Sequence, residues 1–124
     1  MVENVPIFSA EDVESFAMLV QYTNDAEVTS ILVSEAGTFA LRVGDKSLVK
    51  AAWAALQDEN VHDDYLKYFK DEVIVNCNTN PSSCYLQNFI AFLNNKLLKG
   101  KKQGILLYKA IYDAQGNIID WVQP

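Results

Sequence analysis

Apolar residues recur every three or four positions in four stretches of the chain, the spacing of helices that bury one face. The stretches cover about residues 10–22, 45–56, 61–70 and 82–99. Ser9 and Asp12 have the spacing of a capping box, and Asp45 is a suitable N-cap for the second stretch. The apolar stripe of that second helix is expected to consist of Leu48, Ala51, Ala52, Ala55 and Leu56.

Runs rich in β-branched and aromatic residues predict two β-hairpins. Residues 28–33 and 38–43 flank a turn that contains Gly37, and residues 105–112 and 118–122 flank the turn at 113–117. A short apolar run, Val73 to Val75, is a candidate for one further strand.

The expected order of elements is α-β-β-α-α-(β)-α-β-β, with hairpins rather than helical crossovers joining most strands. This order predicts a single α+β domain over residues 1–124, in which about four helices cover one face of a mixed or antiparallel sheet. The hydrophobic share of 50% is enough for such a domain to fold alone.

The formal net charge of −6 argues against nucleic acid and anionic membranes as partners, because both require clustered basic residues. Residues 1–62 carry three basic and ten acidic residues, a net charge of −7, whereas residues 63–124 carry seven basic and six acidic residues, a net charge of +1. The acidic half could steer a basic partner.

The chain has no basic segment followed by an apolar one at its start, and no apolar run of the length that a membrane helix needs. We therefore expect a cytoplasmic protein in which Cys77 and Cys84 are reduced thiols, since small domains that depend on disulfides usually have more cysteines. A secreted protein whose signal has been removed is the alternative.

Recognisable catalytic and cofactor motifs are absent from the sequence. His62 lies beside Asp63 and Asp64, but neighbouring side chains on a helix point in different directions, which disfavours a base with an orienting carboxylate. Two cysteines and one histidine do not have zinc-site spacing. We expect no catalytic residue, metal or cofactor, and favour a protein that is not an enzyme.

The aromatic residues are the main functional signal. Residues 105–112 are apolar on both faces, so something besides the helices should cover the second face of this strand. The candidate binding residues are Tyr65, Tyr108, Tyr112 and Trp121. One hypothesis is an interaction module or small subunit that self-associates or binds a protein partner through the C-terminal hairpin. The alternative is a small-ligand binding domain, or an unrecognised enzyme, with an aromatic pocket between sheet and helices.

Overall fold

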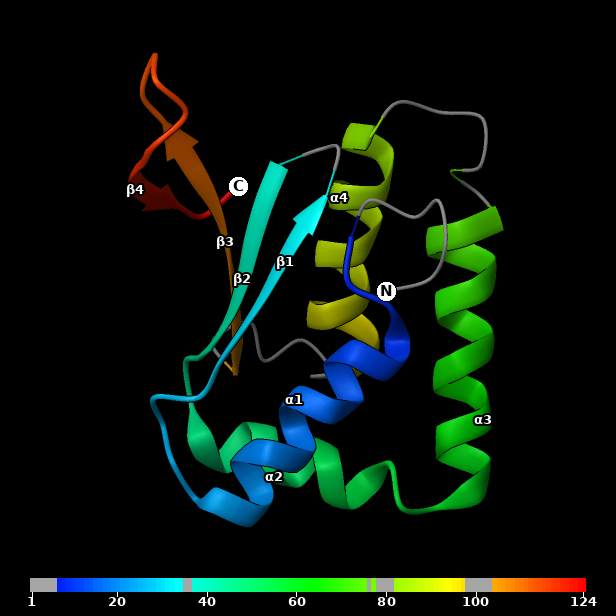
Figure 1. The fold of residues 1–124 in the computed structure, drawn as a ribbon. Coiled ribbons are helices and arrows are strands. Elements are labelled where there is room, and N and C mark those ends of the chain that lie inside the picture. Colours follow the sequence, from blue (N-terminus) through cyan, green and yellow to red (C-terminus); the bar gives the residue numbers. More distant parts are fainter. Residues whose placement is uncertain (1–6, 35–36, 76, 78–81, 98–103) are drawn as a thin grey trace.

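The strands form one antiparallel sheet in the order β1-β2-β3-β4, and the helices gather on one side of it (Figure 1). The computed structural model describes residues 7–34, 37–75, 77, 82–97 and 104–124. The strands are β1 (Thr29–Ser34), β2 (Gly37–Val43), β3 (Ile105–Tyr112) and β4 (Ile118–Val122). The helices are α1 (Ala10–Thr23), α2 (Lys46–Ala55), α3 (Glu59–Tyr68) and α4 (Ser82–Ala91), and π-helical segments η1 (Phe69–Val75) and η2 (Phe92–Leu97) continue α3 and α4. The predicted α+β class and the order of its main elements are confirmed.

Side-chain caps begin the helices where the sequence predicted them. The Ser9 hydroxyl accepts a hydrogen bond from the Asp12 amide at 3.1 Å, and the Asp12 carboxylate accepts one from the Ser9 amide at 2.8 Å. Asp45 caps α2 by accepting from the Leu48 amide at 3.2 Å. These bonds satisfy amide groups that have no partner within the first turn of a helix.

Two expectations about the middle of the chain were wrong. In the predicted stripe of α2, Ala52 and Leu56 are buried and Leu48 is half-buried, as expected, but Ala51 and Ala55 are exposed. Val49 is buried in their place, so the buried face is rotated from the predicted stripe. The run that ends at Val75 is not a strand, because the helix of α3 continues through it as η1. The predicted helix over residues 82–99 is present as α4 and η2, and residues 98–99 lie outside the described part of the chain.

A core rich in phenylalanine fills the space between sheet and helices. Alternate residues of the two central strands point into it, among them Phe39 and Leu41 from β2 and Ile105 and Leu107 from β3. The ring centroid of Phe92 lies 5.1 Å from that of Tyr65, which joins η2 to α3. The inner face of the sheet packs on this core, and none of the described helices lies over the opposite face (Figure 1).

Candidate functional site

The face of the sheet that points away from the helices is the candidate site, and we call it the outer face. On β3, Ile105 and Leu107 enter the core, so the alternating Leu106, Tyr108 and Ala110 lie on the outer face. Ala110 pairs with Trp121 of β4, which places the indole on the same face.

Small residues occupy the centre of this face. Ala40 is only 4% exposed and Ala110 only 5% exposed. Their cross-strand partners are Tyr108 for Ala40 and Trp121 for Ala110. The large side chains of Tyr108 and Trp121 therefore lie beside the small side chains of Ala40 and Ala110.

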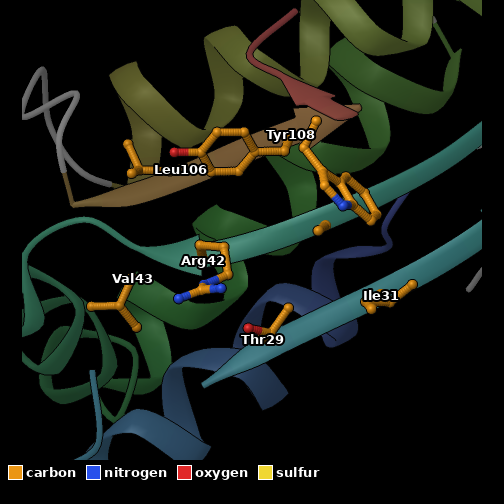
Figure 2. A pocket seen from close by; sticks show the side chains of 8 residues that line it. Thr29, Ile31, Arg42, Val43, Leu106 and Tyr108 are labelled. Carbon is orange, nitrogen blue, oxygen red and sulfur yellow. The ribbon is translucent and has the colours of Figure 1, made fainter. Parts of the chain in front are cut away.

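This arrangement leaves an open hollow of about 490 Å³, which lies across three strands and reaches β4. Figure 2 shows Leu106 and Tyr108 along β3, Arg42 on β2, and Thr29 and Ile31 on β1. Ala40, Val43 and Trp121 complete the lining. The volume lies within the range of roughly 300–1,000 Å³ that is usual for binding pockets.

Arg42 gives one end of the hollow a positive charge. Its guanidinium lies 3.0 Å from a carboxylate oxygen of Glu27, whose side chain is 81% exposed. The Nε atom of Arg42 is buried and has no hydrogen-bond partner among the described residues. Because exposed ion pairs are weak, an incoming anionic group could replace Glu27 at the guanidinium.

The four residues proposed from the sequence do not line one common pocket. Tyr108 and Trp121 both line the hollow, and Tyr112 lies farther along the outer face, where its hydroxyl shares a hydrogen bond with the Thr38 hydroxyl. Tyr65 lies in the helical layer, on the other side of the sheet. The aromatic hollow is thus on the outer face, whereas the sequence placed such a pocket between sheet and helices.

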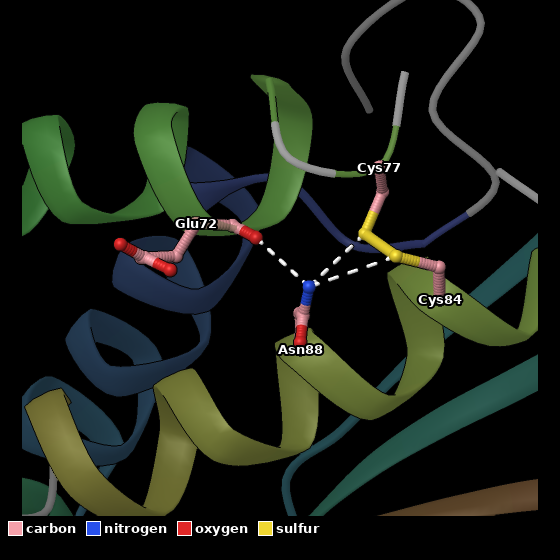
Figure 3. Close-up of a disulfide and its surroundings, with 4 residues drawn as sticks. All are labelled: Glu72, Cys77, Cys84 and Asn88. Carbon is pink, nitrogen blue, oxygen red and sulfur yellow. Dashed lines mark hydrogen bonds between the residues drawn. A yellow bond between two sulfur atoms is a disulfide. The ribbon is translucent and has the colours of Figure 1, made fainter. Parts of the chain in front are cut away.

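The two cysteines correct another expectation. Cys77 and Cys84 form a disulfide, so the prediction that both are free thiols is wrong (Figure 3). The side-chain amide of Asn88 donates to the Glu72 carbonyl at 3.0 Å and lies 3.1 Å from the Cys77 sulfur. Oxidised sulfur is not a nucleophile, and disulfides persist mainly in oxidising compartments, so the bond argues against a cysteine enzyme and weakens the cytoplasmic prediction.

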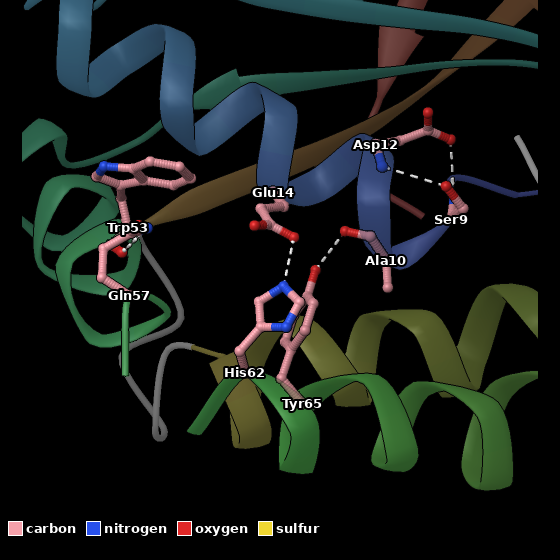
Figure 4. Close-up of polar contacts among 8 residues, drawn as sticks. All are labelled: Ser9, Ala10, Asp12, Glu14, Trp53, Gln57, His62 and Tyr65. Atoms are coloured by element: carbon pink, nitrogen blue, oxygen red, sulfur yellow. Dashed lines mark hydrogen bonds and ion pairs between the residues drawn. The ribbon is translucent and has the colours of Figure 1, made fainter. Parts of the chain in front are cut away.

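Tyr65 serves the helical core. Its hydroxyl donates to the Ala10 carbonyl at 2.5 Å, which links α3 to the start of α1 (Figure 4). Burial raises the pKa of Tyr65 well above its ordinary value, and the nearby carboxylates, Glu14 first among them, raise the pKa further. The Tyr65 hydroxyl is therefore neutral at physiological pH, and it makes a structural hydrogen bond rather than releasing its proton.

His62 pairs with a residue that the sequence did not suggest. Its Nε2 atom lies 2.9 Å from a carboxylate oxygen of Glu14 on α1, and both side chains are partly buried (Figure 4). The two residues are 48 positions apart, so no local pattern could reveal the pair. A histidine paired with a carboxylate can form part of a catalytic site, but here the His62–Glu14 pair and the neighbouring bond from Tyr65 to Ala10 both link α3 to α1 (Figure 4).

Metal sites and membrane spans can be assessed for the described residues. Within them, no group of three or more His, Cys, Asp or Glu residues is placed to hold a metal ion. In the same part of the chain, every helix is too short or too polar to cross a membrane.

The chain matches no family model, no curated protein and no solved structure. Its function therefore has to be inferred from the geometry of its own residues.

Proposed function

We propose that this chain is a non-enzymatic interaction module that binds a protein partner through the outer face of its sheet. The observation that carries the proposal is the hollow in which Tyr108 and Trp121 stand over a floor of small residues such as Ala40. Large aromatic side chains in a recess are typical anchors of protein interfaces.

The apolar surface continues beyond the hollow on both sides, which favours a macromolecule over a small ligand. On β1, Ile31 and Val33 are 61% and 73% exposed. On the other hairpin, Tyr112 and Ile118 form a cross-strand pair, and both are exposed. Exposed apolar residues that adjoin one another across several strands are unusual on a monomer and mark interaction surfaces.

The hollow is also well prepared for binding. Tyr108 and Trp121 are half-buried opposite Ala40 and Ala110, so part of their side-chain freedom is already lost before a partner binds. Arg42 adds a charge at the rim, where charges contribute more to orientation and association rate than to affinity. The partner that suits this face presents an apolar surface with an acidic group at its edge.

The test compares three immobilised proteins in extracts of the source organism, with the bound proteins quantified by mass spectrometry. They are the wild type, the double variant Tyr108→Ser with Trp121→Ser, and the control Tyr22→Ser. Tyr22 is an aromatic residue of α1 that is 75% exposed and does not line the hollow. We expect a protein that the wild type and the control retain and the double variant loses.

Circular dichroism must show that the double variant remains folded. If all three proteins retain the same set, the outer face does not bind a partner and the proposal is refuted.

A second candidate is a small amphipathic carboxylate, which the Arg42 guanidinium at the end of an apolar hollow of about 490 Å³ favours. In a Trp53→Phe background, Trp121 is the remaining tryptophan and its fluorescence reports on the hollow. Saturable quenching by medium-chain fatty acids, lost with Arg42→Met, would favour this candidate. A flat titration would exclude that ligand class.

A further inference from the structure

We propose that two copies of this chain pair through the edge of β1 that lies away from β2, with the two Leu32 residues facing each other across the two-fold axis, to form a continuous eight-stranded sheet. This contact uses the backbone at one edge of the sheet. Although Ile31 also lines the hollow, the pairing does not require a partner bound there.

β1 is an edge strand, because β2 is its neighbour on one side and the sheet order ends with β1 on the other. In an antiparallel sheet, alternate residues of an edge strand direct their N–H and C=O groups away from the paired neighbour. A second strand is the partner whose chemistry satisfies such a row of donors and acceptors.

The two edges of the sheet differ in their protection against such pairing. β4 has five residues, includes the charged Asp120, and pairs with β3 through an irregular register at Ile111 and Tyr112. Short length, charge and bulges are the usual devices that keep edges from pairing. β1 has six residues, pairs with β2 in an unbroken register, and contains no charged residue, proline or glycine.

The sequence of β1 is complementary to itself in one antiparallel register. With Leu32 opposite its own copy, Ile31 of each chain lies opposite Val33 of the other, and these two residues are among the most exposed apolar side chains of the domain. A register centred on Ile31 would instead place Thr29 opposite Val33, which matches polar with apolar. Centring on Leu32 therefore matches apolar with apolar at Ile31, Leu32 and Val33.

Charge and topology also suit a second copy. The net charge of −6 disfavours association of identical chains in general, but the paired strands themselves carry no charge, so like charges do not face each other across the new ladder. In this register, residues that lie opposite each other are on the same face of the sheet. The helices of both copies therefore lie on one side of the eight-stranded sheet. The two hollows would then open on one common face, and the dimer would present two binding sites.

The test is sedimentation equilibrium over a micromolar to millimolar concentration series. We expect a reversible dimer for the wild type and for the control Val33→Thr, which keeps a β-branched side chain. Val33→Lys should raise the dimer Kd at least tenfold, since lysine on an edge strand opposes pairing. The same change on the opposite edge, Val122→Lys, should leave the dimer Kd within twofold of the wild type.

A cross-linking experiment tests the register. An oxidised mixture of Ile31→Cys and Val33→Cys chains should form covalent dimers faster than either variant alone. A wild type that is monomeric throughout the series, or a Val33→Lys variant that dimerises like the wild type, would overturn the proposal. Loss of the dimer in the Tyr108→Ser, Trp121→Ser variant would assign self-association to the outer face and also overturn it, without touching the proposed function.

Discussion

Replacement of Phe89 by alanine should be among the most destabilising single changes in this domain. Phe89 is fully buried in α4, and its ring lies near three others at centroid distances of 6.2 Å to Phe8, 6.5 Å to Phe69 and 6.2 Å to Phe92. It thus joins the segment before α1, the start of η1 and the start of η2.

The expected cost follows from this packing. Truncation of a buried phenylalanine to alanine costs roughly 3–5 kcal/mol through lost burial and the cavity left behind. Loss of three ring contacts places Phe89→Ala toward the upper end of that range, at about 4 kcal/mol. Since domains of this size unfold at about 5–15 kcal/mol, the variant would keep only part of its stability.

Urea unfolding followed by far-ultraviolet circular dichroism measures the difference. Gln87→Ala, at an exposed position of the same helix, is the matched control and should change the free energy of unfolding by less than about 0.5 kcal/mol. Phe89→Leu should fall between the two. A cost below about 1 kcal/mol for Phe89→Ala would refute the assignment of this ring to the core.

Two further predictions concern the helical layer. Replacing Cys77 and Cys84 together by alanine should lower the free energy of unfolding by about 2.5 kcal/mol, which is the loop-closure contribution for cysteines seven positions apart. Thiol titration of the unfolded, unreduced wild type should find no free thiol. Two free thiols would contradict the disulfide. Tyr65→Phe should cost about 1 kcal/mol at pH 8 through the lost bond to Ala10. The folded-state pKa of Tyr65 is raised above its ordinary value of 10.0, so the wild type should lose stability as the pH rises above about 10. The difference in unfolding free energy between the wild type and Tyr65→Phe should then shrink. A difference that stays constant up to about pH 11 would argue against the raised pKa.

Local signals were sufficient to predict most of the elements. The capping box at Ser9, the cap at Asp45 and the turn at 113–117 act within a few residues, and the structure forms all three. Gly116 has a φ of 84° in that turn, a conformation that glycine adopts without strain. Hairpin connections then implied antiparallel pairing, which the sheet has throughout.

Features that depend on distant residues could not be predicted. The sequence of α2 did not show that Val49 rather than Ala51 is buried, because the buried face depends on packing in the folded chain, where α2 contacts α1. Three apolar residues ending at Val75 fit a strand or a helix equally well. They are helical because η1 continues directly from α3. The pairing of His62 with Glu14 joins two helices that only the folded chain brings together.

For the candidate site, alternation along β3 was informative, because it placed Tyr108 on the face opposite Ile105 and Leu107. The same argument does not extend to Tyr65, whose helical position gave no way to tell a core ring from a binding ring. The missed signal was the small residue Ala40, which lies between the large core residues Phe39 and Leu41 in the sequence of β2.

The two faces of β2 differ in side-chain size, so one face packs on the core while the other leaves a hollow. Toward the helices it presents Phe39 and Leu41, whose burial contributes to stability. Toward the outside it presents Ala40, which is too small to fill the space between Tyr108 and its neighbours, so a hollow remains. Because the core does not require that hollow to be filled, we expect changes in Tyr108 to cost little folding stability, which suits the binding role proposed for this face.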